Sequence, residues 1–105
     1  MAWVFLFFAG LFEVVWAYSM KRSEGFSLLI PTVITLIFMF ASFQLLAQSM
    51  RTIPLGTAYP IWTGIGAVGS FVVGMLFLGE TASPARILAV LLIAAGIALM
   101  GYDAA

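Results

Sequence analysis

The chain has 105 residues, of which 65% are hydrophobic and only 8% are charged, and its four basic residues balance its four acidic ones. An ordinary soluble domain carries about 25% charged residues, so this composition indicates a membrane protein. Cysteine and histidine are absent, which excludes disulfides and a Cys/His metal site. The balanced charge offers no basic surface for nucleic acid, and we expect no metal and no cofactor.

Four apolar segments lie in or near the length range of roughly 17–25 residues that spans a bilayer as a helix. They cover residues 2–20, 28–49, 55–78 and 86–102, and the short breaks between them hold nearly all of the remaining charge. The sequence therefore predicts an all-α membrane protein, with a single four-helix transmembrane domain over residues 1–105. No basic stretch precedes the first segment and no convincing cleavage site follows it, so we expect this helix to be retained rather than removed as a signal peptide.

Glu13 is the only ionisable side chain between Met1 and Met20. It lies about twelve residues, or roughly 18 Å, from the start of its helix, near the middle of the bilayer. Acids at that depth are costly and usually mark an ion or substrate pathway. Trp16 and Gly10 are three residues away on either side, so we expect an indole one turn along and an open slot one turn back.

The second and third segments add polar and aromatic side chains that we expect to face the same cavity. Ser42 lies near the middle of its span, although a buried serine often bonds only to its own helix backbone. The third segment carries a stripe at positions i, i+3, i+4 and i+7, which comprises Tyr59, Trp62, Thr63 and Gly66. Aromatic stripes are more often packing than recognition, but here they accompany an unpaired acid. Carboxylates attract cations and aromatic faces add roughly 0.5–2 kcal/mol, so the predicted ligand is a small organic cation.

Four short helices enclose little volume, so we expect more than one copy of the chain to build the pocket. Small residues permit close helix contacts, and the fourth segment has such a cluster without any buried polar group, which favours a dimer contact. Its members are Ala94, Gly96 and Ala98. The loops on one side hold Lys21, Arg22 and Arg86 against Arg51 on the other. This weak charge bias permits either one fixed orientation in the membrane or insertion in both orientations.

Three stretches of the sequence resemble the small multidrug resistance transporters: Gly10–Ala17, Lys21–Phe26 and Gly56–Gly69. Trp16 beside the glutamate and the run Trp-Thr-Gly-Ile-Gly-Ala in the third helix are similar to the guanidinium-exporter subtype. The broad-specificity drug exporters of the same family usually lack that tryptophan.

The resemblance implies an antiparallel, dual-topology dimer in a bacterial inner membrane, whose two central glutamates exchange protons for guanidinium. Glu13 would be the shared proton and substrate site, and helix 4 would make the dimer contact. The resemblance also places Trp16, Ser42, Tyr59 and Trp62 around that site. Gly10 and Thr63, expected from their spacing, complete the predicted lining. The helix-3 hinge would comprise Gly64, Gly66 and Gly69. The partner copy would be identical, or alternatively a paralogue.

Pro60 departs from the family pattern, which usually has a small residue there. Proline cannot donate to the carbonyl four residues earlier, at Gly56, so we expect either a harmless kink or a displaced Tyr59 ring. The alternatives to guanidinium export are a multidrug exporter of the same fold and a non-transporting assembly subunit. No nucleophile–base pair or metal cluster suggests an enzyme.

Overall fold

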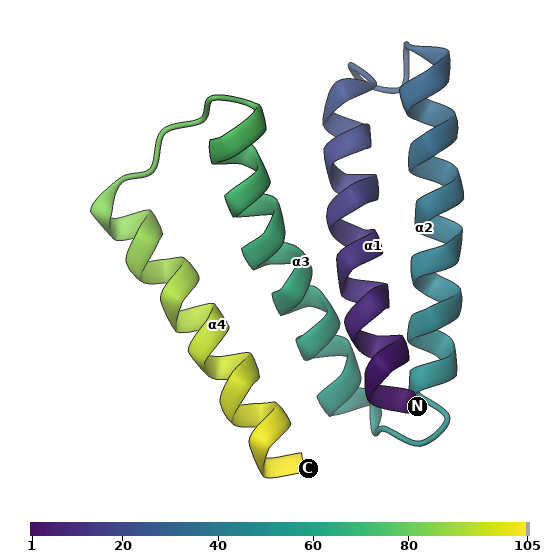
Figure 1. Cartoon of the computed structure of the whole chain (residues 1–105), viewed down its shortest axis with the longest axis vertical. Coiled ribbons are helices and arrows are strands. Elements are labelled where there is room, and N and C mark those ends of the chain that lie inside the picture. Colours follow the sequence, from purple (N-terminus) through teal and green to yellow (C-terminus); the bar gives the residue numbers. More distant parts are fainter. Residues whose placement is uncertain (105) are drawn as a thin grey trace.

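The computed structural model describes residues 1–104, which form four helices joined by short loops (Figure 1). They are α1 (Ala2–Arg22), α2 (Leu29–Ser49), α3 (Leu55–Phe77) and α4 (Pro84–Ala104). Each is long and apolar enough to cross a membrane, and each begins and ends within two residues of the range expected from the sequence. The largest differences are two more residues at the end of α1, where Lys21 and Arg22 continue the helix, and two more at each end of α4.

The ends of α1 and α4 follow from local chemistry. Lys21 and Arg22 occupy the last turn of α1, where positive charge complements the negative end of the helix dipole. Ser23 then closes the helix: its backbone N–H donates to Ser19 O at 2.9 Å and its hydroxyl donates to Met20 O at 2.6 Å. Pro84 begins α4, a position where its missing N–H costs nothing.

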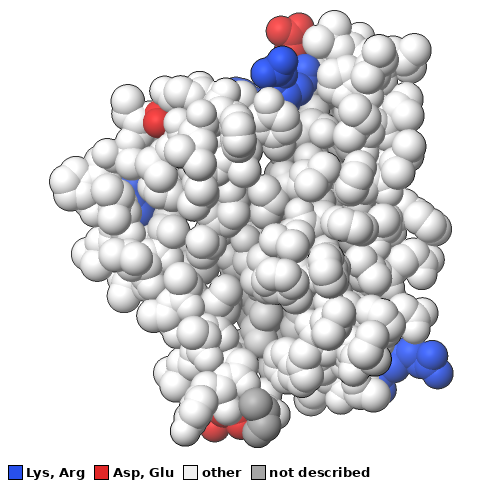
Figure 2. All heavy atoms as spheres, viewed as in Figure 1, with Lys and Arg blue, Asp and Glu red and all other residues white. Residues whose placement is uncertain are grey.

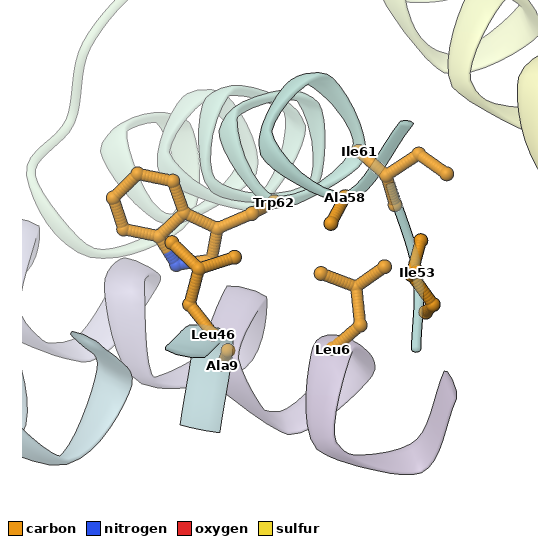
Figure 3. Close-up of a cluster of buried hydrophobic side chains, with 7 residues drawn as sticks. All are labelled: Leu6, Ala9, Leu46, Ile53, Ala58, Ile61 and Trp62. Atoms are coloured by element: carbon orange, nitrogen blue, oxygen red, sulfur yellow. The ribbon is translucent and has the colours of Figure 1, made fainter. Parts of the chain in front are cut away.

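The helices pack as a row rather than as a closed bundle. α1 lies between α2 and α3, and α4 packs only against α3 among the described residues (Figure 1). The buried apolar side chains gather where α1, α2 and α3 meet near the N-terminus (Figure 3). They are Leu6, Ala9, Leu46, Ile53, Ala58, Ile61 and Trp62.

The outer surface is almost uncharged, as expected for a protein surrounded by lipid. On the face drawn in Figure 2, the Lys, Arg, Asp and Glu side chains lie toward the ends and edges of the molecule, and its middle is uncharged. Within residues 1–104, α4 has no buried side chain at all. Its side that faces α3 is only partly buried, because α4 has a single neighbouring helix among these residues.

Candidate functional site

Glu13 points from the middle of α1 toward α3, and its carboxylate lies directly against Gly66. A Cβ atom added to Gly66 would overlap the Oε1 atom of Glu13, so this approach requires glycine. Oε1 is buried and has no hydrogen-bond partner among the described residues. The sequence therefore places an acid within the membrane, and the fold leaves one of its oxygens without a donor.

Trp16, one turn farther along α1, has an unpaired donor where Glu13 has an unpaired acceptor. Its indole Nε1 is also buried and has no acceptor within residues 1–104. An unsatisfied buried polar group costs about 1–3 kcal/mol. Two such groups, one acceptor and one donor, lie on the same side of one helix, because Glu13 and Trp16 are three residues apart. This is the arrangement expected where a ligand, a proton or water completes the site.

Ser42 joins three helices through two hydrogen bonds. Its hydroxyl donates to the backbone oxygen of Ala9 in α1 at 2.7 Å, and the indole Nε1 of Trp62 in α3 donates to Ser42 Oγ at 3.0 Å. All of these atoms are buried. Ser42 thus bonds to other helices instead of to its own backbone. Thr35, two turns earlier in α2, donates instead to Pro31 O of its own helix at 2.7 Å.

A row of aromatic rings continues from this bond. Trp16 meets Phe43 edge-on at 6.2 Å between ring centroids, Phe43 meets Trp62 at 5.9 Å, and Trp62 meets Tyr59 at 5.4 Å. Phe43 was not among the expected site residues. Its only sequence signal is that it follows Ser42, and in a helix made almost entirely of apolar residues that signal does not distinguish it. Tyr59 is 50% exposed, so the row is open at its α3 end.

Two expected lining residues lie differently from the sequence interpretation. The open slot predicted at Gly10 is absent in the single subunit, because Ile65 of α3 fills it and a Cβ added to Gly10 would overlap that side chain. Thr63 is exposed, whereas Trp62 and Gly66 are buried. The predicted stripe therefore divides: Gly66 lies against the Glu13 carboxylate, Trp62 bonds to Ser42 of α2, and Thr63 is exposed.

The glycines of the predicted hinge are all contact points in this conformation. Gly64 lies against Ile97 of α4 and Gly69 lies against Val14 of α1, and an added Cβ would overlap either neighbour. α3 is one continuous helix from Leu55 to Phe77, with Pro60 inside it. The hinge role remains a prediction, and so does the dimer contact at Ala94, Gly96 and Ala98, which lie on the unburied α4.

The described residues contain no group of three or more His, Cys, Asp or Glu side chains that could hold a metal ion. The chemistry available at the site is consequently that of one carboxylate, one unpaired indole N–H and aromatic faces. Such a site can bind a proton or a cation.

Comparison with known proteins agrees with this arrangement. Residues 1–93 match the family described as Small Multidrug Resistance protein. The chain is 57% identical over 97 residues to a protein of Salmonella typhimurium strain LT2 named guanidinium exporter, with 92% of each chain covered. Proteins of the same name from Yersinia pseudotuberculosis and Citrobacter freundii are 58% and 55% identical over 97 residues, covering 92% of this chain and 93% and 92% of their own. The resemblance seen in the sequence is confirmed: this chain is a multi-pass inner-membrane protein that belongs to the Small Multidrug Resistance family.

Proposed function

We propose that this protein is a proton-coupled antiporter that exports guanidinium or small substituted guanidinium cations. The observation that carries the proposal is the Glu13 carboxylate, which is held in the membrane interior with a buried oxygen that no residue of the described chain satisfies. The relatives named guanidinium exporter support the same substrate class.

The chemistry of the site suits a flat cation. Guanidinium presents paired N–H donors that match a carboxylate bidentately, so charge and orientation are satisfied together. The rings of Trp16, Trp62 and Tyr59 can contribute cation–π attraction to a cation that lies beside Glu13. Because the bond from Trp62 to Ser42 fixes one indole, the wall is rigid on that side, which favours a small planar ligand over a bulky one.

Competition for one carboxylate supplies the coupling. A buried carboxylate without a partner is stabilised either by a proton or by a cation, and each excludes the other. In a pocket that opens alternately to the two sides, protons binding on one side release the cation, and the cation binding on the other releases protons. No separate proton channel is needed, and no enzymatic step is involved.

A second copy of the chain completes the pocket in this proposal. The aromatic row is open at Tyr59, Thr63 is exposed beside it, and α4 presents an entirely unburied apolar face to a partner. We propose an antiparallel dimer through Ala94, Gly96 and Ala98, with an identical chain or a paralogue as the partner. Two glutamates facing one cation would then exchange two protons for each guanidinium, a net movement of one charge.

Transport in proteoliposomes tests the proposal. A guanidinium gradient imposed on the wild-type protein should produce an electrical current that depends on the proton gradient, and Glu13→Gln should abolish it. Glu24→Gln is the matched control, because Glu24 lies in the exposed loop after α1 and should carry wild-type current. Saturable guanidinium flux without proton movement would contradict the antiport.

The substrate assignment is tested by competition. Tetraphenylphosphonium, a bulky hydrophobic cation, should compete poorly with guanidinium for the purified protein. Equal competition would instead identify a multidrug exporter of the same fold. Protein that binds neither cation and moves none would identify a non-transporting assembly subunit.

A further inference from the structure

A cavity with several polar lining residues lies between α1 and α3, toward the ends of these helices that carry Lys21 and Leu78. Its volume is about 220 Å³. Water occupies about 30 Å³ per molecule in the liquid, so the cavity has room for several waters or for one small organic cation. Its polar lining residues are Tyr18, Lys21, Ser70 and Glu80.

The backbone at the end of α3 places the Glu80 carboxylate in this cavity. Gly79 adopts a φ of +67°, which turns the chain back, and the N–H groups of Leu78 and Glu80 both donate to Gly74 O, at 3.2 and 3.0 Å. The Glu80 carboxylate then lies over Gly74, where an added Cβ would overlap Oε1. Gly74 is buried, so the carboxylate covers the last turns of α3.

The electrostatics of this position call for a cation. The C-terminal end of a helix carries roughly −0.5 of an elementary charge, so a carboxylate on the last turns of α3 is repelled unless positive charge is present. Within residues 1–104, Glu80 forms no ion pair, although Lys21 lines the same cavity from the exposed end of α1. The carboxylate and the helix end thus both attract a cation, and the Lys21 ammonium is the competitor such a cation must displace.

Tyr18 already holds a guanidinium group. The guanidinium carbon of Arg22 lies 5.8 Å from the Tyr18 ring centroid, and Arg22 also donates to the Tyr18 hydroxyl at 3.4 Å. The ring is fixed by an edge-on contact with Phe77 at 6.3 Å. A ring that binds the chain's own guanidinium, and that also lines the cavity containing Glu80, offers the same chemistry to a dissolved one.

The cavity adjoins the Glu13 site but is separated from it. Val14 lines the cavity and directly follows Glu13 in the chain, and its side chain lies against Gly69. Any movement that separates α1 from α3 at this contact would open a path between the cavity and the Glu13 carboxylate. We propose that the cavity bounded by Tyr18, Ser70 and Glu80 is a second binding site for guanidinium-type cations, through which they reach or leave Glu13. This inference rests on the proposed function and adds a site to it.

The test detects binding when the central site is disabled. In Glu13→Gln protein reconstituted in bicelles, guanidinium should produce saturable shifts of the Ser70 and Gly74 amide NMR signals. Urea, which has the same planar shape without the charge, should not. The shifts should disappear in Glu13→Gln/Glu80→Gln and persist in Glu13→Gln/Glu24→Gln, the matched control. Absence of saturable shifts in Glu13→Gln, persistence without Glu80, or an equal response to urea would overturn the proposal.

Two further variants keep the test decisive if the double variant does not fold. Glu80→Gln alone should need about two- to fivefold more guanidinium than the wild type for half-saturation of transport, as expected for losing one exposed charge pair. Lys21→Gln in the Glu13→Gln background should strengthen binding, because the competing ammonium is gone. An unchanged half-saturation in the first, or weaker binding in the second, would contradict the site. Failure of the proposed function is read separately, from the absence of wild-type transport.

Discussion

Gly66→Ala is the substitution whose effect on guanidinium binding follows most directly from the structure. The added methyl group would occupy space taken by the Glu13 carboxylate. Carbon and oxygen atoms need a separation of about 3.5 Å, so either the carboxylate or the α3 backbone must move by about 1 Å or more. α3 is continuous and is packed on both α1 and α4, so we expect the carboxylate to move.

The displacement translates into a loss of affinity. Charge-assisted N–H···O bonds have lengths of about 2.7–2.9 Å, and a 1 Å shift breaks at least one of the two that a carboxylate makes with guanidinium. One hydrogen bond to a charged group contributes about 1.5–3 kcal/mol. We therefore expect Gly66→Ala to weaken guanidinium binding by about ten- to a hundredfold.

Calorimetric titration of the purified protein with guanidinium measures this change. Gly56→Ala is the matched control, since the same substitution in the same helix meets nothing within 4 Å and should retain the wild-type Kd. Both variants gain helix propensity, about 1 kcal/mol per glycine replaced, so a difference between them reflects the contact with Glu13. Wild-type affinity in Gly66→Ala would refute the reasoning; if transport were slowed at unchanged Kd, the result would favour the hinge role of Gly66 instead.

Three further predictions concern the same site. Ser42→Ala leaves the Trp62 indole without its acceptor and should weaken guanidinium binding by about three- to twentyfold. This range follows from interhelical hydrogen bonds of about 0.6–1.7 kcal/mol in membranes. Thr35→Val removes only a bond within α2 and should have wild-type affinity in the same titration. Trp16→Phe keeps an aromatic ring but removes the unpaired indole N–H. We expect guanidinium affinity to fall about tenfold, because this N–H contacts the ligand or the carboxylate in the proposed site. Wild-type affinity would instead assign Trp16 to packing. Guanidinium added to weakly buffered protein should acidify the solution, and Glu13→Gln should release no protons under the same conditions.

The sequence predicts the helices of this protein well because each span has a length set by the bilayer and ends at a charge, a proline or a glycine. It also identifies Glu13, since an ionisable residue is conspicuous among apolar neighbours. Neither inference needs to know which side of a helix faces another helix. Both depend on position along the chain alone.

The orientation of each helix about its own axis is what the sequence does not determine. In a soluble protein, polar residues mark the outward face, but here lipid and protein interior are equally apolar. Periodicity predicts Trp62, Thr63 and Gly66 on one side of α3, yet Trp62 and Gly66 are buried and Thr63 is exposed. The sequence fails to predict that Ile65 fills the slot at Gly10 for the same reason. A glycine indicates that another group packs closely against the helix, but it does not indicate which group.

α3 is the element on which both sites depend. Four of its glycines contact side chains from three different places: Gly64 from α4, Gly66 and Gly69 from α1, and Gly74 from the loop that follows α3 itself. Moving α3 relative to α1 therefore changes the surroundings of the Glu13 carboxylate and of the cavity at Glu80 at the same time. Close contacts of this kind are either made or broken, and do not stretch gradually, which is the property that switching between discrete states requires. In the proposed carrier, one set of glycine contacts on α3 would therefore couple the exposure of the Glu13 carboxylate to the exposure of the cavity at Glu80.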